Sequence, residues 1–212
     1  MKSKFMLIVV GIILVVVVFI KVDPFNREEK ENKNQKTTVI LDLTELFPSK
    51  ATTLKFEEGD NKYQLKVTDV KKENDTTTIV TQYDMKDGEE TTTVETTYVI
   101  FPEKVVESGK YISNGEVVSV IYPTELLVGI PYENMSWKSA DELITNKVVS
   151  MKNNQVTIES VRVIDTYEEG KSEPIKKDYK ETRVFEKDKG IVLFRSEIVG
   201  DKATVSERKL VK

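Results

Sequence analysis

Apolar and polar residues alternate in short stretches along most of the chain after residue 37. Tyr63, Leu65 and Val67, for example, alternate with polar residues directly after a turn-forming Glu-Glu-Gly-Asp-Asn sequence at 57–61. A period of two places every second side chain on one face, which is typical of a half-buried β-strand. Because such stretches recur with turn residues between them, the pattern predicts a mainly β fold, an antiparallel β-meander that forms an open barrel or a sandwich. The expected strands are 37–43, 54–56, 63–67, 76–83, 92–100, 105–106, 111–112, 117–122, 148–151, 156–164, 183–185, 191–194 and 203–211.

Two short segments fit helices better than strands. Residues 124–128 follow Pro123, which is expected to end the first series of strands. Residues 139–145 begin at Ser139, a residue type that caps helix N-termini. The sequence therefore predicts one short helix in each of these places.

A hairpin is predicted at Asp87-Gly88. This pair suits the two central positions of a type I′ turn, because glycine takes a positive φ without strain. A turn centred there pairs Tyr83 with Thr92 and Ile79 with Thr96. The side chains that would then share one face are Ile79, Tyr83, Val94, Tyr98 and Ile100.

A continuous apolar run from Phe5 to Ile20 precedes the β-patterned part. As a helix, its sixteen residues span about 24 Å, and Lys4 and Lys21 can extend to the head groups to complete a membrane core of about 30 Å. A cleaved signal peptide is the alternative, but no small-residue cleavage site follows the run, and no cysteine could carry a lipid. We expect a signal-anchor, a single transmembrane helix in the cell membrane with the N-terminus in the cytoplasm and the C-terminal domain outside.

These patterns divide the chain into three parts. Residues 1–22 are expected to form a cytoplasmic stub and the transmembrane anchor, and residues 23–36 a charged tether that is too polar to bury surface. Residues 37–212 would form one extracytoplasmic all-β domain, which is long enough for a core of its own.

Short motifs recur in the same order within this domain. Leu54-Lys55-Phe56 resembles Met135-Ser136-Trp137, and at the same offset Val67 corresponds to Val148. Ordered self-similarity is typical of repeated structural units. It indicates two tandem related halves, 37–123 and 124–212, that share one core.

The residue types exclude several kinds of chemistry. The chain has 212 residues, a formal net charge of −4, no cysteine and no histidine. Histidine-based triads, cysteine nucleophiles, disulfides and the usual Cys/His zinc sites are therefore ruled out. Nucleic-acid binding normally needs a basic patch, which an acidic domain does not offer, so we expect no nucleic-acid partner. We also expect no cofactor and no metal.

Aromatic residues are the candidates for a ligand site. Trp137, the single tryptophan, could form a platform for a ligand, and Tyr63, Tyr83 and Tyr98 could line a cavity between the halves. Packing in a filled core is the alternative for all four and the one that we favour. The acidic segments 57–60 and 84–90 lack the spacing of a calcium loop and are expected to be hairpin turns. No catalytic, cofactor-binding or metal-binding residue is predicted.

Three short motifs follow one another in an order that resembles a known group of proteins. They are Leu46-Phe47-Pro48, then Gly129-Ile130-Pro131 leading to Trp137, and Lys189-Gly190-Ile191-Val192. In this order they resemble uncharacterised exported domains, often lipoproteins, of low-GC Gram-positive bacteria. The chain departs from that pattern at Val192, where a second glycine is common, and in having an anchor in place of a lipidated cysteine. The resemblance implies an envelope location and a β fold, and it brings no activity.

We therefore expect a membrane-anchored binding or structural module of the bacterial cell envelope without catalytic activity. It would contact the membrane through Phe5 to Ile20 and hold a lipid, another hydrophobic ligand or a protein partner. One alternative is a carboxylate-dependent envelope hydrolase, which needs two carboxylates facing one cleft. Another is a regulatory partner of an envelope enzyme.

Overall fold

The computed structural model describes residues 38–87, 90–167 and 173–211, so the run Phe5 to Ile20 and the tether lie outside the described residues. Within these ranges the chain is mainly β, as predicted. No helix there has the length and apolar character that a membrane crossing requires. The elements are η1 (a 3-10 helix, Leu43–Leu46), β1 (Thr52–Glu58), β2 (Asn61–Glu73), β3 (Thr76–Asp87), β4 (Glu90–Ile100), β5 (Lys104–Ser113), β6 (Glu116–Val128), β7 (Ser136–Lys138), β8 (Ile144–Lys152), β9 (Gln155–Thr166), β10 (Ile175–Glu186), β11 (Gly190–Ile198) and β12 (Asp201–Leu210).

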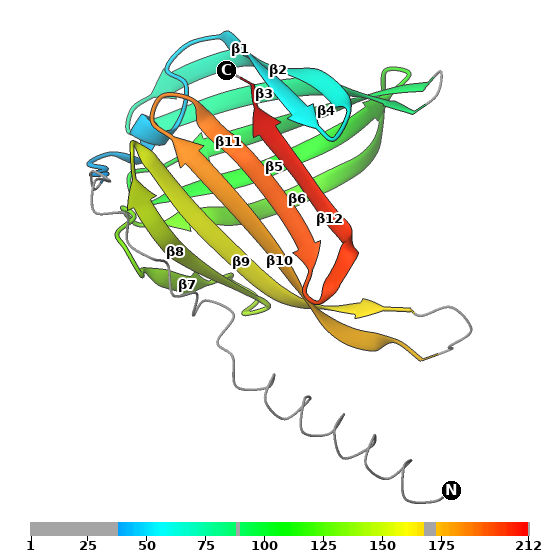
Figure 1. Cartoon of the computed structure of the whole chain (residues 1–212). Coiled ribbons are helices and arrows are strands. Elements are labelled where there is room, and N and C mark those ends of the chain that lie inside the picture. The colour runs from blue at the N-terminus through cyan, green and yellow to red at the C-terminus, as the bar shows by residue number, and fades with distance from the viewer. Residues whose placement is uncertain (1–37, 88–89, 168–172, 212) are drawn as a thin grey trace, which may run out of the picture. The chain divides into compact units, whose positions relative to one another are not determined.

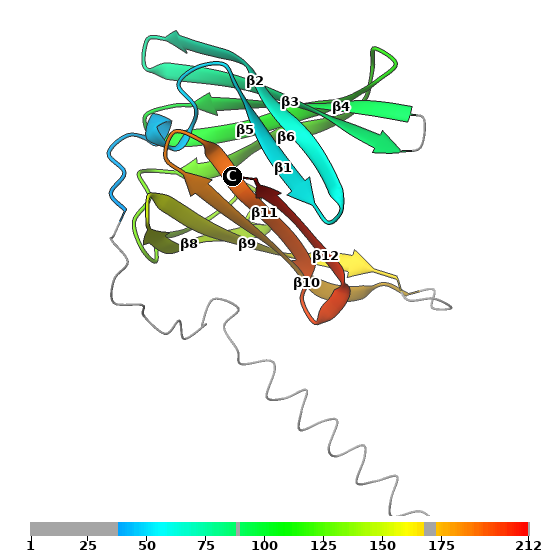
Figure 2. The same ribbon diagram turned by 45° about the horizontal axis from the view of Figure 1, so that its top comes forward.

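All twelve strands belong to one antiparallel sheet (Figure 1). Their order is β6-β5-β4-β3-β2-β1-β12-β11-β10-β9-β8-β7, so pairing of the first strand with the last joins two runs of six. The sheet curls until β1–β6 and β7–β12 face each other across the interior (Figures 1 and 2). The result is an almost closed barrel rather than a sandwich, and the ladder is interrupted between β6 and β7.

Residues 38–48 fill one end of this barrel. The carboxylate of Asp42 accepts a hydrogen bond of 2.8 Å from the Thr44 backbone N–H, and the Glu45 side chain accepts one of 3.1 Å from the Asp42 N–H. This capping box begins the 3-10 helix at Leu43. Residues 38–42 form no strand either, so the strand predicted at 37–43 is wrong over its described part, 38–43. Phe47 then packs inside the barrel, with its ring centroid 5.2 Å from that of Tyr98 and 5.8 Å from that of Phe185.

Residues 38–48 are called the plug below, and the apolar core lies around them. It draws on both runs of strands, because residues of β2–β6 and of β8–β10 meet in one buried cluster. Its members are Ile40, Leu43, Leu46, Phe47, Val67, Ile79, Ile100, Val105, Leu126, Leu127, Val148, Met151, Val156, Ile158 and Phe185.

The two predicted helices are wrong. β6 continues through Pro123 to Val128, because it is an edge strand and one side of its backbone needs no ladder partner. Residues 139–145 form a tight turn and the start of β8, in which the Ser139 hydroxyl accepts a 3.0 Å hydrogen bond from the Ile144 N–H. Ser139 therefore stabilises a turn and does not cap a helix.

The predicted β3–β4 hairpin exists with a different register. Asp87 pairs with Glu90, so Tyr83 faces Val94 and Ile79 faces Tyr98, two residues along from the predicted partners. A shift of two residues leaves every side chain on its original face. For this reason the predicted inward face is correct although the pairing is not.

Both runs carry a β-bulge at corresponding positions. The β2–β3 register shifts just after Val67, and the β8–β9 register shifts just after Val148, the residue that the sequence aligns with Val67. Both valines are buried in the core. The first run, however, ends at Val128, so the predicted boundary between 123 and 124 lies within a strand.

Candidate functional site

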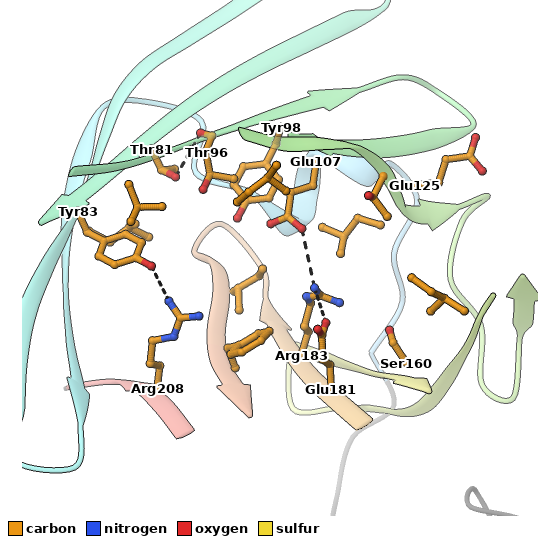
Figure 3. Close-up of a pocket in the computed structure, with 18 of the residues that line it drawn as sticks. Thr81, Tyr83, Thr96, Tyr98, Glu107, Glu125, Ser160, Glu181, Arg183 and Arg208 are labelled. Atoms are coloured by element: carbon orange, nitrogen blue, oxygen red, sulfur yellow. Dashed lines mark hydrogen bonds and ion pairs between the residues drawn. The ribbon is translucent and has the colours of Figure 1, made fainter. Parts of the chain in front are cut away.

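Beyond the core the barrel is hollow. A cavity of about 460 Å³ is lined by side chains from β1–β6 and from β8–β12. Figure 3 shows that polar groups from the two facing runs of strands approach one another inside it. Such a volume lies in the range of about 300–1,000 Å³ that is usual for a pocket holding one small molecule.

The inward side chains of β10 show how the interior changes along the barrel. Phe185 is completely buried in the core, and Arg183, Glu181 and Tyr179 follow it along the same face and line the cavity. Tyr179 pairs with Arg162 of β9, which is exposed and marks the mouth. Because alternate residues share a face, the same strand places Phe185 in the apolar core, the charged pair Arg183 and Glu181 in the cavity, and Tyr179 near the mouth.

Arg183 forms a polar bridge across the cavity. Its Nη2 lies 2.6 Å from Oε2 of Glu181 and 3.9 Å from Oε2 of Glu107, which projects from β5 on the facing run (Figure 3). The Tyr98 hydroxyl is hydrogen-bonded to Glu107, and burial raises the pKa of Tyr98 well above its usual value. The charge of Arg183 is therefore neutralised by two carboxylates.

Arg208 forms a second bridge, from β12 to β3. Its Nη1 donates a 3.0 Å hydrogen bond to the hydroxyl of Tyr83, and its guanidinium lies 4.7 Å from the centroid of the Phe194 ring (Figure 3). The carboxylate that pairs with it, Glu58, is distant, with 4.0 Å between Nε of Arg208 and Oε2 of Glu58. Arg208 thus has aromatic and phenolic neighbours where Arg183 has carboxylates.

An aromatic wall adjoins Arg208. The rings of Phe56 and Tyr63 are stacked with their centroids 5.6 Å apart, and the rings of Tyr63 and Tyr83 are 5.1 Å apart. Burial raises the pKa of Tyr63 to about 12, although the positive charge of Arg208 acts in the opposite direction. Burial raises the pKa of Tyr83 as well. Both phenols therefore keep their protons near neutral pH and remain hydrogen-bond donors.

The close approach of β4 to β5 requires glycine at position 109. It pairs with Thr96, and a Cβ atom at this position would lie 2.7 Å from the backbone oxygen of Glu95. No side chain can be accommodated there without moving β4 or β5. Its partner Thr96 lines the cavity, and a larger side chain at 96 would take up cavity volume.

The structure brings together three of the four aromatic candidates. Tyr63, Tyr83 and Tyr98 line the cavity, so the core-filling interpretation that the sequence favoured is wrong for Tyr63 and Tyr83, whereas Tyr98 also packs on Phe47. Trp137 packs against the core from β7, as favoured, and its Nε1 is buried without a partner among the described residues. The acidic residues at 57–60 lie at the β1–β2 turn, and the described ranges hold no acidic cluster that could bind a metal ion.

Sequence reasoning missed the charged residues of the cavity. Arg183 and Glu181 could have been found from the sequence, because they lie two and four residues before Phe185 and so share its inward face of the strand. A charged residue at an inward position is rarely tolerated unless it has a partner or a function. Arg208 carries a weaker signal, since nothing in its local sequence reveals that Tyr83, 125 residues away, is its partner.

No protein-family model, curated protein or solved structure matches the chain.

Proposed function

We propose that the β domain is a binding module that takes up one small apolar or amphiphilic molecule in the barrel cavity. The hollow interior is the observation that carries this proposal, since a domain with a purely structural role has no need of a cavity of about 460 Å³. Eight-stranded barrels have just enough interior for side chains or one small ligand, and a barrel of twelve strands is wider. Here the plug at 38–48 fills one end and leaves the other for a ligand.

Uptake of a neutral fluorescent dye tests this proposal. N-phenyl-1-naphthylamine should brighten with the wild-type protein, and Thr96→Trp should weaken its binding about tenfold, because the indole would occupy the cavity that Thr96 lines. The barrel is best obtained from the folded full chain by cleavage at a protease site introduced after Asn34, where the compact unit 35–212 begins. The measurement is a fluorescence titration.

Thr97→Trp is the matched control. Thr97 lies next to Thr96 on β4 and faces the other side of the sheet, so the same substitution there should leave dye binding unchanged. Absence of any brightening with the wild type, or equal loss in the two variants, would show that the cavity does not bind apolar molecules.

We also propose that the module is held outside the cell membrane by the run Phe5 to Ile20. The length of this run, its flanking lysines and the resemblance to exported envelope domains support this location. The full chain should remain in the membrane pellet after an alkaline wash, and a protease added to intact cells should digest the β domain. A mature protein whose N-terminus lies after Ile20 would contradict the anchor.

A second candidate function is carboxylate-dependent hydrolysis of an envelope polymer. The observation in its favour is that Glu107 and Glu181 both lie within 3.9 Å of the same nitrogen of Arg183, inside one cavity. Their ion pairs with Arg183 weigh against it, since neither carboxylate is left free to move a proton. Cleavage of purified cell-wall polymer by the wild type, lost in Glu181→Gln, would favour the hydrolase over the binding module.

We further propose that the two six-stranded runs are related halves formed by duplication. The corresponding bulges after Val67 and Val148 support this, as does the meeting of both runs in one core. Aligned homologues in which the two halves become more alike would support the duplication. Homologues that lack either bulge would count against it.

A further inference from the structure

The charged groups of the cavity differ in how well they are neutralised. Arg183 has carboxylate oxygens at 2.6 and 3.9 Å. Arg208 has one carboxylate oxygen at 4.0 Å among the described residues, at the limit of an ion pair. The partner, Glu58, also accepts a 2.5 Å hydrogen bond from the Ser206 hydroxyl, so its charge is shared. Of the two arginines that bridge the cavity, Arg208 therefore has the weaker carboxylate partner.

Hydrogen-bond donors converge on the same place. The guanidinium of Arg208 carries five N–H donors, of which one is used by Tyr83. The Tyr83 hydroxyl accepts that bond, which leaves its own proton to donate to another acceptor, and Tyr63 lies beside it. Tyr63 is also hydrogen-bonded to Arg208, and no acceptor within the described ranges takes the protons of the two phenols. The site lacks acceptor oxygens, and an acidic group would supply them.

A second cation, Arg162, is exposed and points to the same kind of ligand. Arg162 lies at the mouth with its guanidinium 4.9 Å from the centroid of the Tyr179 ring, and no described carboxylate lies within ion-pair distance of it. A cation held over an aromatic ring at an entrance attracts anions to the opening. An anionic ligand would therefore meet positive charge first at Arg162 and again at Arg208.

The surroundings of Arg208 suit an apolar chain. The guanidinium lies against the Phe194 ring, Phe56 and Tyr63 stack next to it, and Leu65 and Val94 also line the cavity. With about 30 Å³ for a water-sized group, the volume of about 460 Å³ holds about fifteen groups the size of a methylene. That is room for one chain of about twelve carbons with its head group, and too little for a lipid with two long chains.

We propose that the ligand of this cavity is a single-chain amphiphile with an acidic head group, bound with that group on Arg208, Tyr83 and Tyr63. This inference rests on the binding function proposed above and adds the charge and size of the ligand. The head group accepts hydrogen bonds from the guanidinium and the two phenols, and the chain lies along the aromatic wall. Carboxylate and phosphate head groups share this chemistry.

Displacement of the neutral dye measures the preference for an acidic head group. Laurate and dodecyl phosphate should displace it from the wild type at concentrations about tenfold or more below those of 1-dodecanol and dodecyltrimethylammonium, because hydrogen bonds to a charged head group are stronger than those to a neutral one. Whichever of laurate and dodecyl phosphate displaces the dye at the lower concentration carries the preferred head group. Equal displacement by laurate, dodecyl phosphate and dodecanol would overturn the inference while leaving the dye-binding function intact.

Variants of Arg208 assign the preference to this residue. Arg208→Gln should remove the advantage of laurate over dodecanol, measured as the ratio of the two displacing concentrations in the same variant, and Arg208→Lys should retain part of this advantage. Lys209 is a neighbouring exposed cation on the other face of β12, and Lys209→Gln should leave the advantage of laurate over dodecanol unchanged. If Arg208→Gln does not fold, the comparison of Arg208→Lys and Lys209→Gln with the wild type decides. A full preference for laurate in Arg208→Gln or Arg208→Lys would overturn the assignment.

Discussion

Replacing Phe185 by alanine should lower the free energy of unfolding by about 3–5 kcal/mol. The Phe185 ring is completely buried, and it packs 5.8 Å from the ring of Phe47, which comes from the plug. Removal of the ring leaves a void between β10 and residues 38–48 that neither can fill, because both are fixed by backbone hydrogen bonds. The loss is a large part of the stability of a domain this size.

Urea denaturation of the released barrel measures this effect. The midpoint should fall while the slope of the transition stays the same, which shows a change in stability rather than in the surface exposed. Tyr122→Ala is the control, because Tyr122 is 77% exposed on β6 and its loss should matter by less than about 0.5 kcal/mol. A loss below about 1 kcal/mol for Phe185→Ala would show that the plug does not pack on β10.

Replacing Lys180 by methionine should lower the free energy of unfolding by about 3 kcal/mol at neutral pH. Lys180 lies on the outer face of β10, and its Nζ is 3.3 Å from Glu159 and 3.2 Å from Glu197. All three side chains are largely buried among the neighbouring strands. Without the ammonium group two carboxylates remain in a poorly solvated place with less positive charge between them.

The pH dependence of this variant should differ in sign from that of the wild type. Burial opposes ionisation of Glu197, yet hydrogen bonds from Arg195 and Lys180 outweigh it and hold its pKa below the usual 4.5. A lowered pKa in the folded state gives stability that is present above about pH 4.5 and is lost on acidification below it. In Lys180→Met, Glu197 stays buried and loses one of these two hydrogen bonds, so its pKa should rise, and acidification from neutral pH towards pH 5 should restore part of the stability.

Lys176→Met is the matched control for Lys180→Met. Lys176 is exposed on the same strand and the same face, and its replacement should change stability by less than about 0.5 kcal/mol. Urea midpoints measured across this pH range test both expectations. A variant of Lys180 whose stability does not rise as the pH falls from 7 to 5 would show that the buried pairs are not the source of the loss.

The sequence predicts the β class because alternation is a local property. Positions such as Tyr63, Leu65 and Val67 alternate in any fold that buries one face of a strand, and Ile79 and Tyr98 were placed on the correct face even with the wrong register. The plug could not be predicted in this way. Residues 38–43 have the composition of a strand, and a capping box centred on Asp42 together with burial in the barrel overrides that preference.

The candidate site was less accessible to sequence reasoning. Tyr63 and Tyr83 were recognised as residues that could line a cavity, but whether the interior is full or hollow depends on how twelve strands close around the plug. The bridge from Arg208 to Tyr83 depends on the same closure, because β12 and β3 lie far apart in the chain. Such partners are fixed by topology, which a single sequence does not contain.

The unpaired edge between β6 and β7 has a mechanical consequence. In a closed barrel every ladder is complete, so its girth is fixed by strand number and tilt. A split ring can widen without breaking a backbone hydrogen bond, and one lip of this split carries Val118, Val120 and Tyr122, all at least half exposed. Leu126 and Leu127 of β6 belong to the same packed cluster as Val148 of β8 and Trp137 of β7, so side-chain packing takes the place of the missing ladder in holding the two runs together.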